Sequence, residues 1–370
     1  MTLLNDLYDQ QGQSPWVDNL KRSYMTGGTL QQMIRDGVRG VTSNPTIFQK
    51  AIAAGSDYDD QFSELAQTHS VEDAYWELVI KDVSDACAVM RTVFDESGGN
   101  DGFVSIEVSP ALALDTAGTT ESARQLAERI KLPNLMVKIP GTQPCLESIR
   151  KMIAEGRNIN VTLIFGIERY GDVIEAYIAG LEDYAANGGS DLAGINSVAS
   201  FFISRVDTEV DRRLDEVGSA EALELRGKAA VAQAKLAYQL FQQRFSGARW
   251  DALASKGAKV QRPLWASTSV KNSAYPDLLY VDSLVGPNTV NTMPDPTVEL
   301  FNDHGVVLRT IDDDVDEAQQ VIDRLMTVGV DMDDVGRTLE NEGVASFTKS
   351  YDELLQVLAD KYEALRDAAH

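Results

Sequence analysis

Residues 133–142 read PNLMVKIPGT, an apolar run that stops at a proline and a glycine. One lysine, Lys138, lies in the middle of this run. Residues two apart in a strand face the same side, so Lys138 shares a face with Met136. The stretch therefore predicts a buried strand whose lysine can point into the mouth of a barrel.

Seven more apolar runs rich in strand-forming residues occur along the chain, and longer amphipathic helical patterns separate them. This alternation is typical of a parallel α/β fold. Five of the seven spacings between run centres are close to the roughly 30 residues of one strand-helix-strand unit, and two are about twice as long. The eight predicted strands are centred at Val17, Thr42, Ile106, Val137, Val161, Ser197, Trp265 and Val290.

We therefore predict an α/β fold of the (β/α)8 TIM barrel type, formed by a single domain over residues 1–370. The two long spacings contain helical patterns at about residues 55–95 and 206–245, which we interpret as insertions into the barrel. Additional helices are predicted at the C-terminus, at about residues 314–368.

Two details concern the last quarter of the chain. The closing helices are predicted at residues 316–330 and 350–369, both with acidic residues near their starts. The segment LLYVDSLVG, residues 278–286, is a ninth apolar run, which we interpret as a loop or short helix that approaches the eighth strand.

The composition limits the possible partners. With 57 acidic and 33 basic residues, the net charge of -24 repels nucleic acid and acidic membrane surfaces, so we expect neither as a partner. A phosphorylated substrate then requires a local basic pocket. The chain has no secretory signal pattern, no apolar run of the roughly 18 residues expected of a membrane span, and only two cysteines, which predicts a soluble, cytoplasmic protein. The sequence does not indicate an oligomeric state.

Polar residues recur at one end of the predicted strands. In an eight-stranded α/β barrel the chemistry takes place at the carboxyl ends of the strands. Seven successive strands carry polar or ionisable residues near that end, which predicts a polar site at the barrel mouth. These candidates are Asp18, Asn44, Glu107, Lys138, Asn160, Thr162, Ser200, Arg205 and Lys271.

Two of the candidates have simple structural interpretations. Asp18 is close in sequence to Lys21 and Arg22, so it can form a surface ion pair with either. Asn44 precedes Pro45 and can cap a turn. Neither residue indicates catalysis on its own.

Glu107 and Lys138 allow two interpretations. A carboxylate buried in a strand is costly unless it has a partner, and a structural ion pair would satisfy both residues. Alternatively, Lys138 is a nucleophile. An amine attacks a carbonyl only when it is unprotonated. Burial lowers the pKa of a lysine from its usual value of about 10.4, which favours the unprotonated form. Ionised acidic neighbours oppose this shift. Schiff-base chemistry also needs groups that move protons and donors that hold substrate hydroxyls, and the strand-end residues supply both.

Six motifs connect these residues to a known family. The first five, in chain order, resemble the motifs of transaldolase, and the sixth resembles its longer bacterial branch of about this length. The resemblance covers nearly the whole chain. The motifs are GVTSNPTIF (40–48), VSIEVSP (104–110), NLMVKIPGT (134–142), NINVTLIF (158–165), ASFFISRVD (199–207) and WASTSVKN (265–272).

The resemblance implies an eight-stranded barrel enzyme that works through a lysine Schiff base. Lys138 matches the lysine that forms the Schiff base. Glu107 matches an acid that works with a water held by the threonine at Thr162. Asp18 matches an aspartate that exchanges a proton with the C4 hydroxyl of the substrate.

The resemblance also implies substrate contacts. Asn44 and Asn160 match asparagines that hold the dihydroxyacetone hydroxyls. Ser200 and Phe202 match a serine and an aromatic wall residue, and Arg205 matches a phosphate-binding arginine.

Lys271 departs from the family pattern. Much of the family has a second phosphate-binding arginine at this position, whereas a lysine is a point charge rather than a two-pronged fork. The neighbouring hydroxyls of Ser267, Thr268 and Ser269 are candidates to compensate for the difference.

The function implied is transfer of a dihydroxyacetone unit from sedoheptulose 7-phosphate to glyceraldehyde 3-phosphate, giving erythrose 4-phosphate and fructose 6-phosphate, in the non-oxidative pentose phosphate pathway. The partners are then small sugar phosphates. No metal or cofactor is expected, because the iminium serves as the electron sink. Two alternatives remain: a fructose 6-phosphate aldolase, which shares the fold and the lysine but releases free dihydroxyacetone, and a non-catalytic barrel that binds sugar phosphates.

Overall fold

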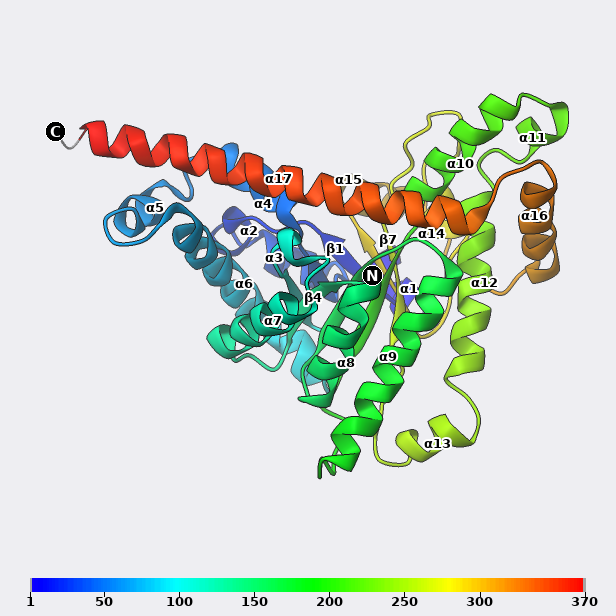
Figure 1. Cartoon of the computed structure of the whole chain (residues 1–370), viewed down its shortest axis with the longest axis horizontal. Helices are drawn as coiled ribbons and strands as arrows, with labels where there is room; N and C mark the ends of the chain where they lie inside the picture. Colours follow the sequence, from blue (N-terminus) through cyan, green and yellow to red (C-terminus); the bar gives the residue numbers. More distant parts are fainter. Residues whose placement is uncertain (1, 369–370) are drawn as a thin grey trace.

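The computed structural model describes residues 2–368, which form a closed barrel of eight parallel strands surrounded by helices (Figure 1). The strands follow one another around the barrel in sequence order, and the first pairs with the last to close it. Each strand contains the centre predicted for it, so the predicted α/β barrel is confirmed. The strands are β1 (Gln13–Asp18), β2 (Gly40–Thr42), β3 (Phe103–Glu107), β4 (Leu135–Pro140), β5 (Ile159–Ile164), β6 (Ser197–Phe202), β7 (Arg262–Ala266) and β8 (Thr289–Met293).

Helices follow the strands and cover the outside of the barrel. The first long spacing holds α5 (Asp59–Leu65) and α6 (Val71–Glu96), and the second holds α10 (Ser204–Val217), α11 (Ala220–Glu224) and α12 (Ala229–Arg244). None of the described helices is both long and apolar enough to span a membrane. The other helices are α1 (Leu3–Gln11), α2 (Arg22–Thr26), α3 (Thr29–Arg35), α4 (Pro45–Ala53), α7 (Thr116–Ile130), α8 (Leu146–Ala154), α9 (Ile167–Ala186), α13 (Ala248–Ala254), α14 (Leu279–Asp282), α15 (Asp295–His304), α16 (Val315–Thr327) and α17 (Met332–Ala368), with short 3-10 turns at Pro110–Leu112 and Gln143–Cys145.

The C-terminal helices differ in part from the prediction. The ninth apolar run contains the short helix α14, as predicted, and α16 lies where the first closing helix was expected. The second closing helix does not begin near residue 350. It begins at Met332 and continues as one helix of 37 residues, α17, so the predicted start is wrong.

Two glycines explain why the start of α17 was misplaced. Gly336 and Gly343 weaken a helix by propensity, but both lie where α17 passes close to the end of β5. A Cβ atom at Gly343 would lie 3.0 Å from Leu163, and one at Gly336 would lie 3.6 Å from the Cα of Gly166. The glycines therefore allow close packing of α17, which crosses the molecule to reach α5 (Figure 1), where Lys361 pairs with Asp59 at 2.7 Å.

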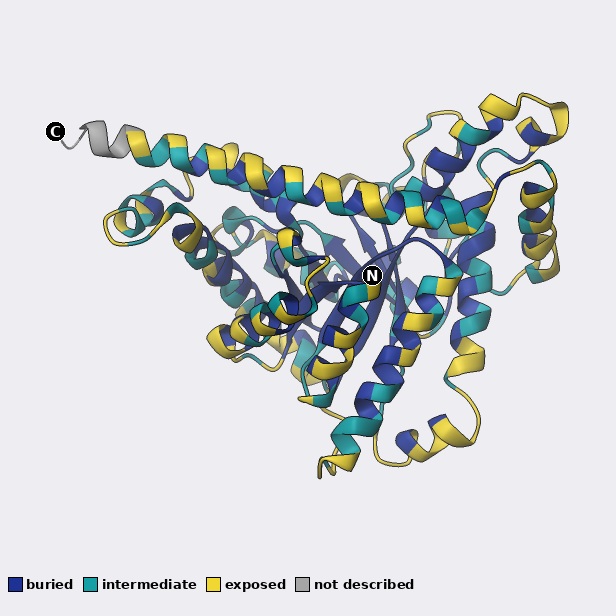
Figure 2. Ribbon diagram, viewed as in Figure 1, coloured by how far each residue is buried: buried dark blue, intermediate teal, exposed yellow. Residues whose placement is uncertain are grey.

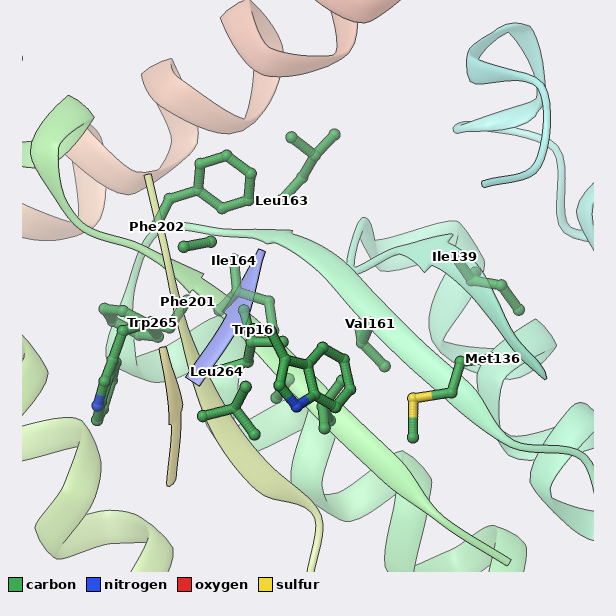
Figure 3. Close-up of a cluster of buried hydrophobic side chains, with 14 of the residues drawn as sticks. Trp16, Met136, Ile139, Val161, Leu163, Ile164, Phe201, Phe202, Leu264 and Trp265 are labelled. Carbon is green, nitrogen blue, oxygen red and sulfur yellow. The ribbon is translucent and has the colours of Figure 1, made fainter. Parts of the chain in front are cut away.

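The end of β5 is irregular. The register between β5 and β6 shifts between Val161 and Ile164, and Leu163 adopts a left-handed φ of 58°. Such a bulge re-aims the side chains around it. Leu163 is buried, and Figure 3 shows it close to Phe202 near the C-terminal end of these strands.

The core lies between the barrel wall and the helices (Figure 2). On β6, Phe201 packs against Tyr170 of α9, with ring centroids 5.8 Å apart. It also packs against Trp265 of β7, with ring centroids 6.2 Å apart (Figure 3). Its neighbour Ser200 faces the inside, where it bonds to Asn160 of β5. The outward faces of the strands are thus apolar, while the inward faces can carry polar groups near the mouth.

Gly40 in β2 allows close contact with Trp16 of β1. The Trp16 ring is fully buried, and its Nε1 donates to Ser14 and Asp101 at 3.0 Å and 3.2 Å. A Cβ atom at Gly40 would lie only 2.3 Å from the Trp16 ring. Because the ring is held by its hydrogen bonds and its neighbours, it cannot easily move away from an added methyl group.

We expect Gly40→Ala to lower the free energy of unfolding by about 1–3 kcal/mol through overpacking against Trp16. Gly55→Ala is the matched control, because a Cβ atom there meets nothing within 4 Å. Urea and thermal unfolding of both variants check the prediction. Equal stability of the two variants would contradict it.

Candidate active site

A cavity of about 300 Å³ opens at the carboxyl ends of the strands, with Phe347 of α17 in its wall. Three further candidates, Glu107, Asn160 and Thr162, are buried on the strands next to Lys138. The structure thus gathers the ten residues predicted from the sequence at one end of the barrel. The seven that line the cavity are Asp18, Asn44, Lys138, Ser200, Phe202, Arg205 and Lys271.

Lys138 lies at the inner end of the cavity. Strand register places it beside Glu107 of β3 on one side and Asn160 of β5 on the other. The side chain is only 5% exposed, and its Nζ lies 3.3 Å from Glu107 Oε2 and donates to the carbonyl of Ser43 at 3.2 Å. The amine is therefore held at a fixed point by its neighbours while it still faces the cavity.

Glu107 keeps hydrogen-bonding capacity that the protein does not use. Its contact with Lys138 is an ion pair, and within the described residues neither carboxylate oxygen has a hydrogen-bond partner of good geometry. Burial raises the pKa of Glu107, and the charge of Lys138 partly opposes this effect. A raised pKa brings a carboxyl closer to the range in which it exchanges protons near neutral pH.

Thr162, like Glu107, carries a hydrogen-bonding group that no described residue uses. Its Oγ1 is buried and has no partner in the part of the chain that the structure describes. Thr162 of β5 pairs with Pro140 of β4, and β4 separates it from Glu107 of β3. The bulge at Leu163 follows Thr162 directly. Buried hydroxyls are almost always hydrogen-bonded, to the protein or to ordered water.

Asp18 ends β1 and faces the cavity. Thr42 of β2 donates to its carboxylate at 2.7 Å. Burial raises the pKa of Asp18; the charges of Lys138 and Arg205 and the Thr42 hydrogen bond oppose this, whereas Asp295 reinforces it. The carboxyl is therefore a candidate for proton exchange.

The surface ion pairs considered for Asp18 do not form. Arg22 pairs instead with the buried Asp82 at 2.9 Å. Lys21 lies over the ring of Tyr24, 4.8 Å from its centroid. The structural interpretation of Asp18 is therefore wrong.

Asn44 combines a structural contact with a place in the cavity. Its Oδ1 accepts a hydrogen bond from Ile47 N at 3.0 Å and so caps α4, a helix that begins with Pro45. Capping uses the side-chain oxygen. The amide nitrogen is the group that Asn44 can offer to a ligand.

Asn160 and Ser200 form a buried hydrogen-bonded chain beside Lys138. Ser200 Oγ donates to Asn160 Oδ1 at 2.7 Å, and Asn160 Nδ2 donates to Ser105 Oγ at 3.0 Å. The chain fixes both side chains, with Ser200 nearer the cavity.

Basic residues line the outer part of the cavity. Arg205 is partly buried between the rings of Phe202 and Phe347, at 5.4 Å and 6.0 Å from their centroids. Lys271 Nζ donates to Ser269 Oγ at 2.6 Å. Burial lowers the pKa of both cations. Within the described residues, neither forms an ion pair with a carboxylate.

The hydroxyl residues that precede Lys271 divide between two places. Ser267 and Ser269 line the cavity. Thr268 is buried away from it, where its Oγ1 donates to Asn291 Oδ1 at 2.9 Å.

Sequence reasoning missed several residues of the site, among them the charged Lys50 and Asp295 and the aromatic Phe347. Lys50 lines the cavity from α4, on the helix face that also carries Thr46 and Ile47, and this spacing is the signal that could have found it. Phe347 comes from a helix that the sequence did not place at the barrel mouth. Asp295, directly after β8, accepts hydrogen bonds from Tyr24 and Asn19 and adds negative charge near Asp18.

Comparisons with known proteins agree with this geometry. The model of the family described as Transaldolase/Fructose-6-phosphate aldolase matches residues 15–358. A transaldolase of Saccharopolyspora erythraea is 50% identical over 355 residues, which cover 95% of this chain and 96% of the relative. A transaldolase of Mycobacterium marinum is 50% identical over 358 residues, and covers 96% of both chains. A transaldolase of Thermobifida fusca is 49% identical over 356 residues, covering 95% of this chain and 96% of its own.

These matches span nearly the whole barrel, and the chain belongs to the transaldolase/fructose-6-phosphate aldolase family.

Proposed function

We propose that this protein is a transaldolase, which transfers a dihydroxyacetone unit from sedoheptulose 7-phosphate to glyceraldehyde 3-phosphate in the non-oxidative pentose phosphate pathway. The products are erythrose 4-phosphate and fructose 6-phosphate. The observation that carries the proposal is a buried lysine at the inner end of a cavity whose outer wall holds unpaired cations. The relatives named transaldolase, about 50% identical over nearly the full length, support the same activity.

The first step joins the substrate to Lys138. The Nζ lone pair adds to the C2 carbonyl of the ketose phosphate and gives a carbinolamine, which loses water to form an iminium ion. We assign the proton transfers to Glu107 and to a water held between Glu107 and the Thr162 hydroxyl. The unused hydrogen-bonding capacity of these buried groups supports this assignment.

The second step breaks the C3–C4 bond. Asp18 takes the proton of the C4 hydroxyl while the bonding electron pair moves into the iminium and forms an enamine on Lys138. The aldose phosphate leaves with the new carbonyl at C4. The iminium itself receives the electron pair, so this route needs no metal or cofactor. Addition of the enamine to the acceptor aldehyde reverses the sequence.

The remaining candidates hold the substrate in this proposal. The amide of Asn44 and the chain of Asn160 and Ser200 bind the hydroxyls of the three-carbon unit. Phe202 forms an aromatic wall and supports Arg205, with which it makes a cation–π contact. Arg205 and Lys271 bind the phosphate group at the outer end.

The proposal also includes how the chain is divided into a domain and additional helices. We propose one transaldolase-like domain, in which the helices at about residues 55–95, 206–245 and 314–368 are additions to the barrel. We also propose a cytoplasmic location. Both cysteines, Cys87 and Cys145, are buried free thiols, as is common in a reducing compartment.

Product analysis tests the proposed activity directly. With fructose 6-phosphate alone we expect almost no free dihydroxyacetone, because the enamine stays on Lys138 until an acceptor arrives. Addition of erythrose 4-phosphate should produce sedoheptulose 7-phosphate and glyceraldehyde 3-phosphate. Rapid release of dihydroxyacetone without an acceptor would instead establish the fructose 6-phosphate aldolase alternative.

Borohydride reduction in the presence of fructose 6-phosphate should trap a covalent adduct on Lys138, found by peptide mass mapping. Lys138→Ala should fold normally and lose essentially all transfer activity and all of the adduct. Lys151→Ala is a control, because Lys151 lies on the surface of α8 and pairs with Glu147. An adduct on a different lysine, or full activity of Lys138→Ala, would assign the nucleophile elsewhere.

Glu107→Gln separates catalysis from a purely structural ion pair. We expect kcat to fall about 10²- to 10⁴-fold, because the variant cannot exchange protons during iminium formation. The borohydride adduct on Lys138 should form more slowly by a similar factor. Both rates are measured at a temperature at which circular dichroism shows the variant folded. A folded variant with an unchanged kcat would favour the non-catalytic interpretation of the pair.

A further inference from the structure

Three cations meet at the outer end of the cavity without a carboxylate partner. Arg205 comes from α10, Lys271 from the segment after β7, and Lys50 from α4. The chain has 57 acidic against 33 basic residues, so carboxylates are abundant elsewhere. Within the described residues, none of the three cations forms an ion pair.

Lys50 is held in place by its helix. Asn44 caps α4, and two side chains of the helix bond to α17: Thr46 donates to Ser350 at 2.8 Å, and Gln49 donates to Glu353 at 2.8 Å. These contacts fix α4 between α17 and the cavity. Lys50 lies one turn beyond Thr46 and Ile47, and all three line the cavity.

The charges around Lys50 are mostly positive. Lys50 and Arg205 both act on Lys271 and lower its pKa in addition to the effect of burial, so the three cations are close enough to repel one another. The carboxylates that act on this group are Asp18, at the inner side, and Glu342 of α17, which acts on Arg205. Collecting like charges costs free energy unless an anion binds among them.

A phosphate dianion fits this arrangement. It can accept hydrogen bonds from several cations at once, and such charge-assisted bonds are strong. Lys271 offers one point charge where an arginine would offer a two-pronged fork. A second ammonium group at the outer end of the cavity would restore a second contact.

We propose that Lys50 is a third substrate-binding residue, which contacts the phosphate group of sugar phosphates together with Arg205 and Lys271. The proposal rests on the transaldolase activity proposed above and adds a residue to its binding site. Lys50 is more exposed than Arg205 and reaches the phosphate from the mouth of the cavity.

Lys50→Gln tests the contact. We expect KM for fructose 6-phosphate and for erythrose 4-phosphate to rise about three- to tenfold. This is the change expected when one partly exposed, charge-assisted hydrogen bond to the phosphate is lost. The inhibition constant of inorganic phosphate should rise by a similar factor. KM for unphosphorylated glyceraldehyde as acceptor should not change. Lys50→Arg should restore most of the affinity, because it keeps the positive charge.

Lys256→Gln is the matched control. It makes the same change in net charge at an exposed lysine just after α13, far from α17 (Figure 1). A similar effect of both variants, an unchanged KM in Lys50→Gln, or an equal loss for phosphorylated and unphosphorylated acceptors would each overturn the proposal. The activity of the wild-type protein distinguishes failure of this proposal from failure of the proposed function. If the wild type transfers dihydroxyacetone and Lys50→Gln has no effect, only the role of Lys50 is rejected. If the wild type shows no transfer, the proposed function itself is rejected.

Discussion

The pairing of β3 with β4 places a carboxylate beside an amine inside the barrel, and the rest of the site depends on this contact. Burying either group alone would be costly. Register puts Glu107 directly opposite Lys138, with 3.3 Å between the charged atoms, so each compensates for the burial of the other. The apolar outer faces of the same strands supply the packing that keeps both groups away from bulk water. The pair can therefore be both a structural element and the centre of the proposed chemistry.

The strands and most site residues could be predicted because both depend on local pattern. Short apolar runs with turn residues at their ends define the strands, and the barrel rule then locates the carboxyl ends. Lys138 was recognisable because a lysine in an apolar run is unusual. Asn44 shows the limit of this approach. The sequence offered a capped turn and a place in the site as alternatives, whereas Asn44 caps the helix α4 and also lines the cavity.

Other features depend on contacts between distant parts of the chain. The start of α17 was misplaced because Gly336 and Gly343 resemble helix breakers until their contacts with the end of β5 are known. Phe347 reaches the cavity because α17 packs against α4, a contact that no local pattern encodes. Asp295 lies after the last strand, where its hydrogen bonds to Tyr24 and Asn19 are made across the closure of the barrel.

The position of Phe347 has a consequence for the order in which the protein matures. The barrel strands are complete at Met293, but the helix that carries Phe347 begins only at Met332. A chain emerges from the ribosome with its N-terminal side first. The barrel can thus assemble with its lysine already in place while one wall of the cavity is still being synthesised. Docking of the last helix then turns an open barrel end into a shielded cavity, so that the buried Lys138 gains its complete surroundings only when the chain is nearly finished.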